Sequence, residues 1–270
     1  MISFPNCKVN LGLNIISKRA DGYHDLETLF YPIAIKDVLE IIEANKTELT
    51  ISGNEIDVPD EENICIKAYQ LLKKKFPALP PVKTHLHKAI PSGAGLGGGS
   101  ADGSFMLKLL TEKFKLSLST KELIDFSLEL GSDCPFFILN KPCVATGRGE
   151  ILEEINLDLS AYKILIVNPG IHINTAWAFT QLSPDSATKS IREIIKQPIE
   201  TWKAELKNDF ETPVFNKYPE IKLIKETLYK DGAVYAAMTG SGSTAFGLFQ
   251  KDVTPAVSFP QNYFVKELIS

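Results

Sequence analysis

Residues 91–101 read PSGAGLGGGSA, and this glycine-rich segment lies between a predicted strand and a predicted helix. Apolar and polar residues alternate over 82–90, as in a half-buried strand, and the apolar segment after the glycines is typical of a helix. Five glycines within residues 93–99 let the backbone approach a ligand closely, because no Cβ atom intervenes. Backbone N–H groups at a helix start attract anions. The segment therefore predicts a phosphate-binding loop.

The motif GxGxxG at residues 93–98 also occurs in dinucleotide-binding folds, but its surroundings differ here. About ninety residues with strands of antiparallel character precede it, and no acidic residue closes a second strand about twenty residues later. A P-loop of the Walker type is excluded, because the sequence contains no Gly-Lys pair. A plain flexible loop is the remaining alternative, and the well-patterned flanking elements disfavour it.

The composition is that of an ordinary globular protein, with 44% hydrophobic and 23% charged residues among 270. This length suits one large domain or two of usual size. The formal net charge of −4 excludes a global attraction to nucleic acid or anionic membranes, so local groups must bind any phosphate. The N-terminal sequence MISFPNCKVNLGLNI shows no signal peptide, transit peptide or membrane span, and we expect a cytoplasmic protein.

The four cysteines, Cys7, Cys65, Cys134 and Cys143, form no CxxC pair and have no histidine cluster beside them. Free thiols in a reduced compartment are therefore the favoured interpretation. A catalytic thiol is the disfavoured alternative, because no histidine stands in a suggestive motif near any of the four.

Strands and helices are mixed without a regular βαβ alternation, which predicts an α+β fold. Predicted strands cover 7–15, 29–42 with breaks at Pro32 and near Asp37, 82–90, 162–167, 233–238, 243–249 and 263–268, and residues 47–58 are predicted to form a hairpin. Predicted helices cover 63–76, 119–131, 175–182, 191–196 and 220–230, besides the one after the glycine-rich segment. The polar stretch 150–160 looks irregular and indicates a domain boundary, so we expect domains at 1–155 and 156–270.

A second glycine cluster, TGSGST at residues 239–244, lies between two predicted apolar strands. A tight hairpin turn explains such a segment without any further function. The alternative is a set of N–H and hydroxyl donors that face a transferred phosphate or a substrate. The residues alone leave both interpretations open.

Two ionisable residues occupy positions suited to acid–base chemistry. Lys8 lies on the polar face of the strand predicted at 7–15, and Asp133 lies in a short connection between two helices. Phosphoryl transfer needs a group that orients or deprotonates the attacking hydroxyl, and a cation near the transferred phosphate. Position alone favours simpler interpretations, a solvated strand lysine and a cap of the next helix.

Three stretches, PNCKVNLGLNI from Pro5, PSGAGLGGGSA from Pro91 and AMTGSGSTAFGLF from Ala237, resemble the three motifs of the GHMP kinase superfamily. The segments KRADGYHDLETLF, GSDCPFFI and NDFE, at 18–30, 131–138 and 208–211, resemble members whose alcohol substrate carries a cytidine diphosphate group. The resemblance covers essentially the whole chain. It implies an ATP-dependent kinase that acts on a small molecule in non-mevalonate isoprenoid precursor biosynthesis.

The resemblance also implies a two-domain α+β fold with the active site in the cleft between the domains. Residues 1–155 would bind ATP and carry the catalytic residues, and residues 156–270 would form the substrate side. Asp133 matches the superfamily's catalytic base, and Lys8 matches the partner that keeps this carboxylate ionised. The residues that match the ATP loop are Pro91, Ser92, Gly93, Ala94, Gly95, Leu96, Gly97, Gly98, Gly99, Ser100 and Ala101.

Mg2+ is expected to accompany ATP, and Ser100 is the residue expected to contact it. The superfamily often has two serines where this chain has Ser100 and Ala101, so Ser104 or Asp102 are possible helpers. Substrate contacts are expected from seven residues, with Trp177 as a rival of Phe179 for the second aromatic ring on the cytosine: Asn10, Tyr23, His24, Phe179, Gly240, Ser241 and Gly242. Asn63 is expected near the adenine of ATP.

Three other functions are weighed against this one. Another kinase of the superfamily would leave Tyr23 and His24 without a cytosine to hold. A non-catalytic nucleotide-binding protein would not need both Lys8 and Asp133. An NAD-dependent oxidoreductase would need the ribose-binding carboxylate that the sequence lacks.

Overall fold

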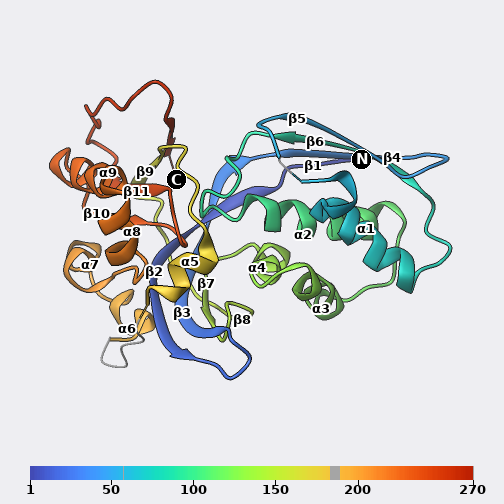
Figure 1. Cartoon of the computed structure of the whole chain (residues 1–270), viewed down its shortest axis with the longest axis horizontal. Helices are drawn as coiled ribbons and strands as arrows, with labels where there is room; N and C mark the ends of the chain where they lie inside the picture. The colour runs from blue at the N-terminus through green and yellow to red at the C-terminus, as the bar shows by residue number, and fades with distance from the viewer. Residues whose placement is uncertain (57, 183–188, 270) are drawn as a thin grey trace. The chain divides into compact units, whose positions relative to one another are not determined.

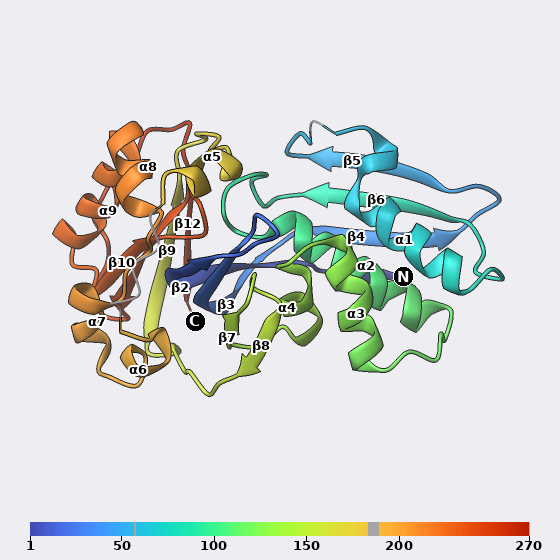
Figure 2. The same ribbon diagram turned by 60° about the horizontal axis from the view of Figure 1, so that its bottom comes forward.

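A computed structural model of the chain describes residues 1–56, 58–182 and 189–269 (Figures 1 and 2). The chain forms two compact units. Unit 1 contains Met1–Lys8, Pro32–Ser92 and Gly97–Lys141, and unit 2 contains Val9–Tyr31, Gly93–Leu96 and Pro142–Ser270. A single boundary after residue 155 does not reproduce these units, because two early segments belong with the later part of the chain. The expected division of functions between 1–155 and 156–270 stays a prediction.

Unit 1 contains a four-stranded sheet with the strand order β1-β4-β6-β5. Its strands are β1 (Ile2–Ser3), β4 (Val38–Glu43), β5 (Glu48–Gly53) and β6 (Val82–Lys88). β4 pairs antiparallel with both β1 and β6, and β5 pairs in parallel with β6. The mixed pairing confirms the α+β prediction and differs from the parallel sheet of a dinucleotide-binding domain.

The hairpin predicted for residues 47–58 is wrong, and residue 57 of this range lies outside the described residues. Residues 48–53 form β5, whose parallel partner β6 begins about thirty residues later. After β5 the N–H of Asn54 donates to the carbonyl of Lys88, and the chain enters a 3-10 helix, η1 (Asp60–Glu62). A parallel pair needs a crossover connection, here α1, which a local turn signal does not reveal.

Four helices follow the sequence signals closely: α1 (Ile64–Lys75), α2 (Gly98–Lys113), α3 (Thr120–Leu130) and α4 (Cys134–Leu139). Asn63 caps α1 by accepting the N–H of Cys65 at 2.9 Å. Ser119 and Glu122 form a capping box at the start of α3. Pro135 lies in the first turn of α4, where a missing N–H is harmless.

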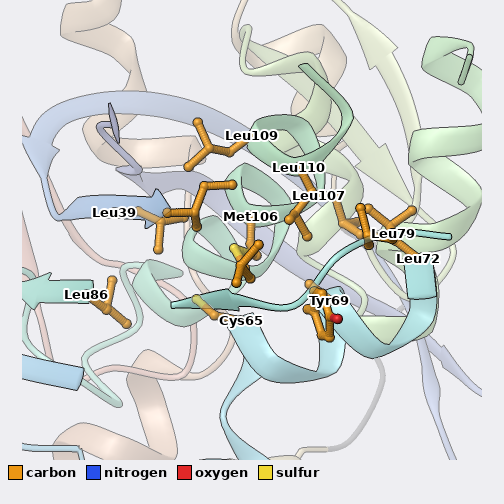
Figure 3. Close-up of a cluster of buried hydrophobic side chains, with 13 residues drawn as sticks. Leu39, Cys65, Tyr69, Leu72, Leu79, Leu86, Met106, Leu107, Leu109 and Leu110 are labelled. Atoms are coloured by element: carbon orange, nitrogen blue, oxygen red, sulfur yellow. The ribbon is translucent and has the colours of Figure 1, made fainter. Parts of the chain in front are cut away.

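The core of unit 1 lies between this sheet and the helices α1 and α2 (Figure 3). Burial alternates along β6, so that Val82, Thr84 and Leu86 face inward while the residues between them face outward. Leu72 from α1 and Leu107 from α2 are fully buried in the same cluster. Each such side chain contributes about 1.5–3 kcal/mol by leaving water, which fixes α2 and hence the end of the glycine-rich segment.

Unit 2 contains an antiparallel sheet with the order β10-β11-β9-β12. Its strands agree with the prediction to within two residues: β9 (Tyr162–Asn168), β10 (Tyr235–Met238), β11 (Ala245–Gln250) and β12 (Phe264–Ile269). The helices are α5 (Thr175–Thr180), α6 (Ile191–Ile194), α7 (Ile199–Glu205), α8 (Glu211–Lys217) and α9 (Pro219–Lys230). α9 packs on β10 and β11. Two short helices, α7 and α8, were not predicted.

A third sheet has the order β2-β3-β7-β8. Its strands are β2 (Asn6–Lys18), β3 (His24–Lys36), β7 (Cys143–Thr146) and β8 (Ile151–Glu154). β3 runs through Pro32, so the predicted break there is wrong, whereas the break at Asp37 is confirmed. Residues 151–154, which were expected to be irregular, pair with β7 as β8. Among the described residues, no helix is long and apolar enough to cross a membrane.

We expect Ser119→Ala to lower the free energy of unfolding by about 1 kcal/mol, because it removes the N-cap of α3. Urea denaturation measures this change. Ser117→Ala, at an exposed serine just before the cap, is the control and should change the free energy by less than about 0.5 kcal/mol. Equal effects of the two substitutions would contradict a stabilising cap.

Candidate functional site

The glycine-rich segment needs glycine at alternate positions. Gly93, Gly95 and Gly97 have φ values of +64°, +78° and +71°, in the left-handed region that other residues avoid. A Cβ atom on Gly95 would overlap the carbonyl oxygen of Thr239. A Cβ atom on Gly97 would lie 3.0 Å from the ring of Phe137 and 3.1 Å from Cε of Lys8. Close backbone approach therefore explains these glycines.

The helix α2 begins directly in this segment, with Gly97 as its N-cap and no side chain capping it. The first N–H groups of a helix have no partner within the helix, and here they belong to Gly98, Gly99 and Ser100. A Cβ atom added to Gly99 would have no described atom within 4 Å apart from its chain neighbours and the backbone of α2 itself. An anion therefore has both space and N–H donors at this helix start.

A buried ionic cluster joins the two ends of this segment within unit 1. Lys88, at the end of β6, donates to Asp37 and to Asp102, the latter at 2.6 Å. Asp37 also accepts the N–H groups of Ala89 and Ile90 at 2.6 and 2.8 Å. Burial raises the pKa of Asp102 to about 7, although the neighbouring Lys88 opposes this shift. The cluster ties the strand before the glycines to the helix after them.

The metal role suggested for Asp102 and Ser104 receives no support from their positions. Asp102 faces Lys88, and Ser104 Oγ lies 2.8 Å from the carbonyl oxygens of both Ser100 and Cys134. Both side chains are buried. Among the described residues, no group of three or more histidine, cysteine, aspartate or glutamate side chains is placed to hold a metal. Ser100, half-buried in the first turn of α2, is the one predicted contact that remains.

Lys8 and Asp133 lie together in unit 1, with 3.4 Å between Nζ and Oδ2. The side chain of Lys8 is 3% exposed and that of Asp133 is 34% exposed. Lys8 is not a solvated strand lysine, because it is buried. Asp133 does not cap the next helix, because its carboxylate makes no capping hydrogen bond to α4. A buried cation beside a partly exposed carboxylate is an arrangement suited to acid–base chemistry.

The second glycine cluster connects β10 to β11 as a hairpin and also packs on residues 93–96 within unit 2. The N–H of Thr244 donates to the carbonyl of Ala94 at 3.2 Å. A Cβ atom on Gly240 would lie 3.2 Å from the carbonyl oxygen of Gly95. The hydroxyl of Ser241 lies 3.0 Å from that of Thr175, and Gly242 is buried. A simple hairpin turn and a set of donors for a phosphate or substrate are therefore both compatible with the structure of this segment.

Asn10 is buried and forms hydrogen bonds to the first residue of the second glycine cluster and to β3. Its backbone N–H donates to Thr239 Oγ1 at 2.9 Å, and its side-chain amide donates to Thr28 Oγ1 at 2.9 Å. Asn63, the residue expected near the adenine, is also buried and acts as the N-cap of α1. The ligand contacts of both asparagines stay predictions.

The aromatic residues expected around the cytosine lie in unit 2. The rings of His24 and Phe179 stack at 4.9 Å with an interplanar angle of 19°. Tyr23 is 55% exposed, and the guanidinium of Arg148 lies 4.5 Å from its ring centre. Trp177, the rival candidate, instead contacts Lys217 at 3.9 Å. The structure thus brings Phe179 and not Trp177 to His24.

Burial, with a smaller contribution from Lys18, lowers the pKa of His24. The imidazole is therefore neutral at pH 7. A neutral ring has one donor and one acceptor nitrogen, which suits a hydrogen bond to the edge of a nucleobase.

Two buried asparagines that were not predicted as site residues form hydrogen bonds to the second glycine cluster and the end of β10. Asn208 donates to the carbonyls of Met238 and Gly240, both at 2.8 Å. Asn168 donates to the hydroxyls of Ser243 and Thr244 at 3.1 and 2.9 Å. The segment NDFE at 208–211 was recognised only as a resemblance, and Asn168 only as the end of a strand.

The four thiols are buried, and each has no measurable exposure. Burial raises the pKa of both Cys7 and Cys134 to about 12, and the pKa of Cys65 is also raised by burial. A thiol that stays protonated at neutral pH is a poor nucleophile. These values agree with structural thiols.

We expect iodoacetamide at pH 8 to leave all four thiols of the folded protein unmodified, because all four are buried. Mass spectrometry of the alkylated protein measures this. In urea, where the pKa of cysteine returns to about 8.5, four modifications should appear. Rapid alkylation of one thiol in the folded protein would show that it is accessible and reactive.

Family models match the chain twice, the GHMP kinases N terminal domain over residues 63–141 and the GHMP kinases C terminal domain over residues 190–260. The 4-diphosphocytidyl-2-C-methyl-D-erythritol kinase of Cytophaga hutchinsonii is 53% identical over 250 residues, which cover 92% of each chain. The enzyme of the same name from Bacteroides fragilis is 52% identical over 256 residues, 93% of each chain.

A crystal structure of a 4-(cytidine 5'-diphospho)-2C-methyl-D-erythritol kinase superposes with a TM-score of 0.79 and 30% identity. The match covers 92% of this chain and 90% of that structure. Sequence and fold thus agree over nearly the full length of both proteins. The chain belongs to the 4-diphosphocytidyl-2-C-methyl-D-erythritol kinase family of the GHMP kinases.

Proposed function

We propose that the protein transfers the γ-phosphoryl group of ATP to the 2-hydroxyl of 4-diphosphocytidyl-2-C-methyl-D-erythritol, a step of non-mevalonate isoprenoid precursor biosynthesis. The observation that carries the proposal is the Lys8–Asp133 pair at 3.4 Å, buried on the lysine side and partly exposed on the aspartate side. The names of the relatives support the substrate. The cytoplasm is the proposed location.

Asp133 is the proposed general base. Its carboxylate accepts a hydrogen bond from the 2-hydroxyl and takes the proton as the new oxygen–phosphorus bond forms. The bond between the γ-phosphorus and the bridging oxygen breaks, and ADP leaves with the electron pair. Lys8 keeps the carboxylate ionised and stabilises negative charge on the attacking oxygen.

The glycine-rich segment is the proposed ATP loop. The N–H groups at the start of α2 donate to phosphate oxygens, and the dipole of this helix adds to the attraction. Mg2+ bound with ATP would neutralise phosphate charge, and the hydroxyl of Ser100 is the proposed protein contact. Asn63 is proposed near the adenine.

The cytosine is proposed to bind among Tyr23, His24 and Phe179. Phe179 is the proposed second aromatic ring because it already stacks against His24. Stacking on an aromatic face contributes about 1–3 kcal/mol per base, and the neutral His24 adds a hydrogen bond to the base edge. Asn10, Gly240, Ser241 and Gly242 are the further proposed substrate contacts.

We expect Asp133→Asn to lower kcat by about 10²–10⁴-fold, because the amide cannot accept the proton. A coupled assay of ADP release with ATP and the cytidine-linked alcohol, with and without Mg2+, measures the rate. Titration with ATP should give a Kd near that of the wild type. Asp125→Asn, at an exposed aspartate of α3, is the control and should retain full activity. Near-normal turnover of Asp133→Asn would remove the general-base role.

We expect Phe179→Leu to raise the KM for the cytidine-linked alcohol by about 5-fold or more, because the base loses a stacking partner. The KM for ATP should stay within two-fold. Trp177→Leu is the matched control on the same helix, and its KM for the alcohol should stay within two-fold. The opposite pattern, a large effect of Trp177→Leu and none of Phe179→Leu, would exchange the two assignments.

A further inference from the structure

The segment NDFE at 208–211 contacts three functional parts of unit 2, although none of the proposed roles uses it. Asp209 accepts the N–H of Ile15 at 2.7 Å, which anchors the segment to β2. Phe210 packs edge-on against Phe179, with ring centres 4.9 Å apart at 88°. Glu211 accepts the N–H of Met238 at 2.8 Å and pairs with Lys225. The segment therefore links β2, the proposed cytosine site and the end of β10.

Asn208 makes the most direct contact with the second glycine cluster. It is 2% exposed, and its amide nitrogen donates to the carbonyls of Met238 and Gly240 at 2.8 Å each. Its amide oxygen accepts the N–H of Phe210 at 3.0 Å. All the hydrogen-bonding groups of this side-chain amide are thus engaged, which fixes its orientation and that of the two carbonyls.

Fixing the carbonyl of Gly240 also fixes the N–H group that follows it. The peptide unit is planar, so the carbonyl of Gly240 and the N–H of Ser241 turn together. Gly240 has a φ value of +57°, and among the described residues no acceptor is shown for the N–H of Ser241. This donor is therefore held open next to Gly240, where the loop packs on Gly95.

We propose that Asn208 is a positioning residue for phosphoryl transfer, which aims the backbone donor of Ser241 at the reacting phosphate. This inference rests on the proposed function, since it assigns a purpose to a donor of that site. Asn208 itself touches neither substrate. Its removal should therefore reduce the rate of the chemical step and leave the binding of both substrates nearly unchanged.

Asn208→Asp is the sharpest test, because it keeps the shape and the acceptor oxygen but replaces the donor by a second oxygen facing two carbonyls. We expect kcat to fall about 10- to 100-fold, the effect of a small misplacement of catalytic groups. The KM values for ATP and for the cytidine-linked alcohol should stay within two-fold. Asn208→Ala introduces no buried charge and should also lower kcat while leaving both KM values nearly unchanged. It provides the test if Asn208→Asp does not fold.

Asn14→Asp is the matched control, because Asn14 is also a buried asparagine of unit 2 that donates to a backbone carbonyl, that of Lys189 at 3.3 Å. Its kcat per folded molecule should stay within two-fold of the wild type. Circular dichroism gives the folded fraction of each variant, and the assays are run well below its unfolding midpoint.

A wild-type kcat in folded Asn208→Asp or Asn208→Ala would overturn the inference. A loss of activity that only follows the loss of folded protein would overturn it too, because it indicates a structural role. A wild-type enzyme that releases no ADP with the cytidine-linked alcohol would instead refute the proposed function, and the inference with it. The wild-type reaction in the same experiment therefore separates the two failures.

Discussion

The backbone of Gly95 lies against the carbonyl of Thr239 so closely that no Cβ atom fits between them, and the arrangement of unit 2 depends on this contact. The contact joins residues 144 positions apart, through the hydroxyl of Thr239 and the carbonyl of Gly95. It requires a left-handed φ at Gly95 and again at Gly240. Glycine is thus needed at this position for packing as well as for ligand approach, and a phosphate-binding role alone would not explain it.

Within unit 1 the equivalent constraint is electrostatic. Lys88, Asp37 and Asp102 are nearly inaccessible to water, and burying such charges is unfavourable unless they are paired and hydrogen-bonded. Breaking a buried pair leaves an uncompensated charge and is strongly destabilising, whereas the intact cluster is close to neutral in its net contribution. The role of the cluster is to fix the position of the last residues of β6 relative to the first turn of α2.

The sequence predicted most elements whose signals are local. The strand at β2, the helix that begins after Ser119 and the helix after the glycines are confirmed, but the polar face of β2 is buried like its apolar face. Burial of Lys8 was not predictable from alternation, because a polar strand face looks the same whether water or another element covers it. Likewise the bond from Asn10 to Thr239 spans 229 residues, and the parallel pairing of β5 depends on β6. Such contacts are set by the tertiary fold, and neither segment carries a local sequence pattern that predicts them.

The side chains that hold the second glycine cluster are neutral, which suits a loop that is proposed to bind a phosphate. Asn168 and Asn208 hold it through their amides, and the hydroxyl of its own Thr239 donates to Gly95; all three groups are neutral. A carboxylate in any of these places would bring negative charge beside donors aimed at a phosphate. The acidic side chains nearby, Asp209 and Glu211, instead accept the N–H groups of Ile15 and Met238. Neutral side chains thus brace the loop without weakening its attraction for an anion, because a like charge at close range raises the free energy of the bound phosphate.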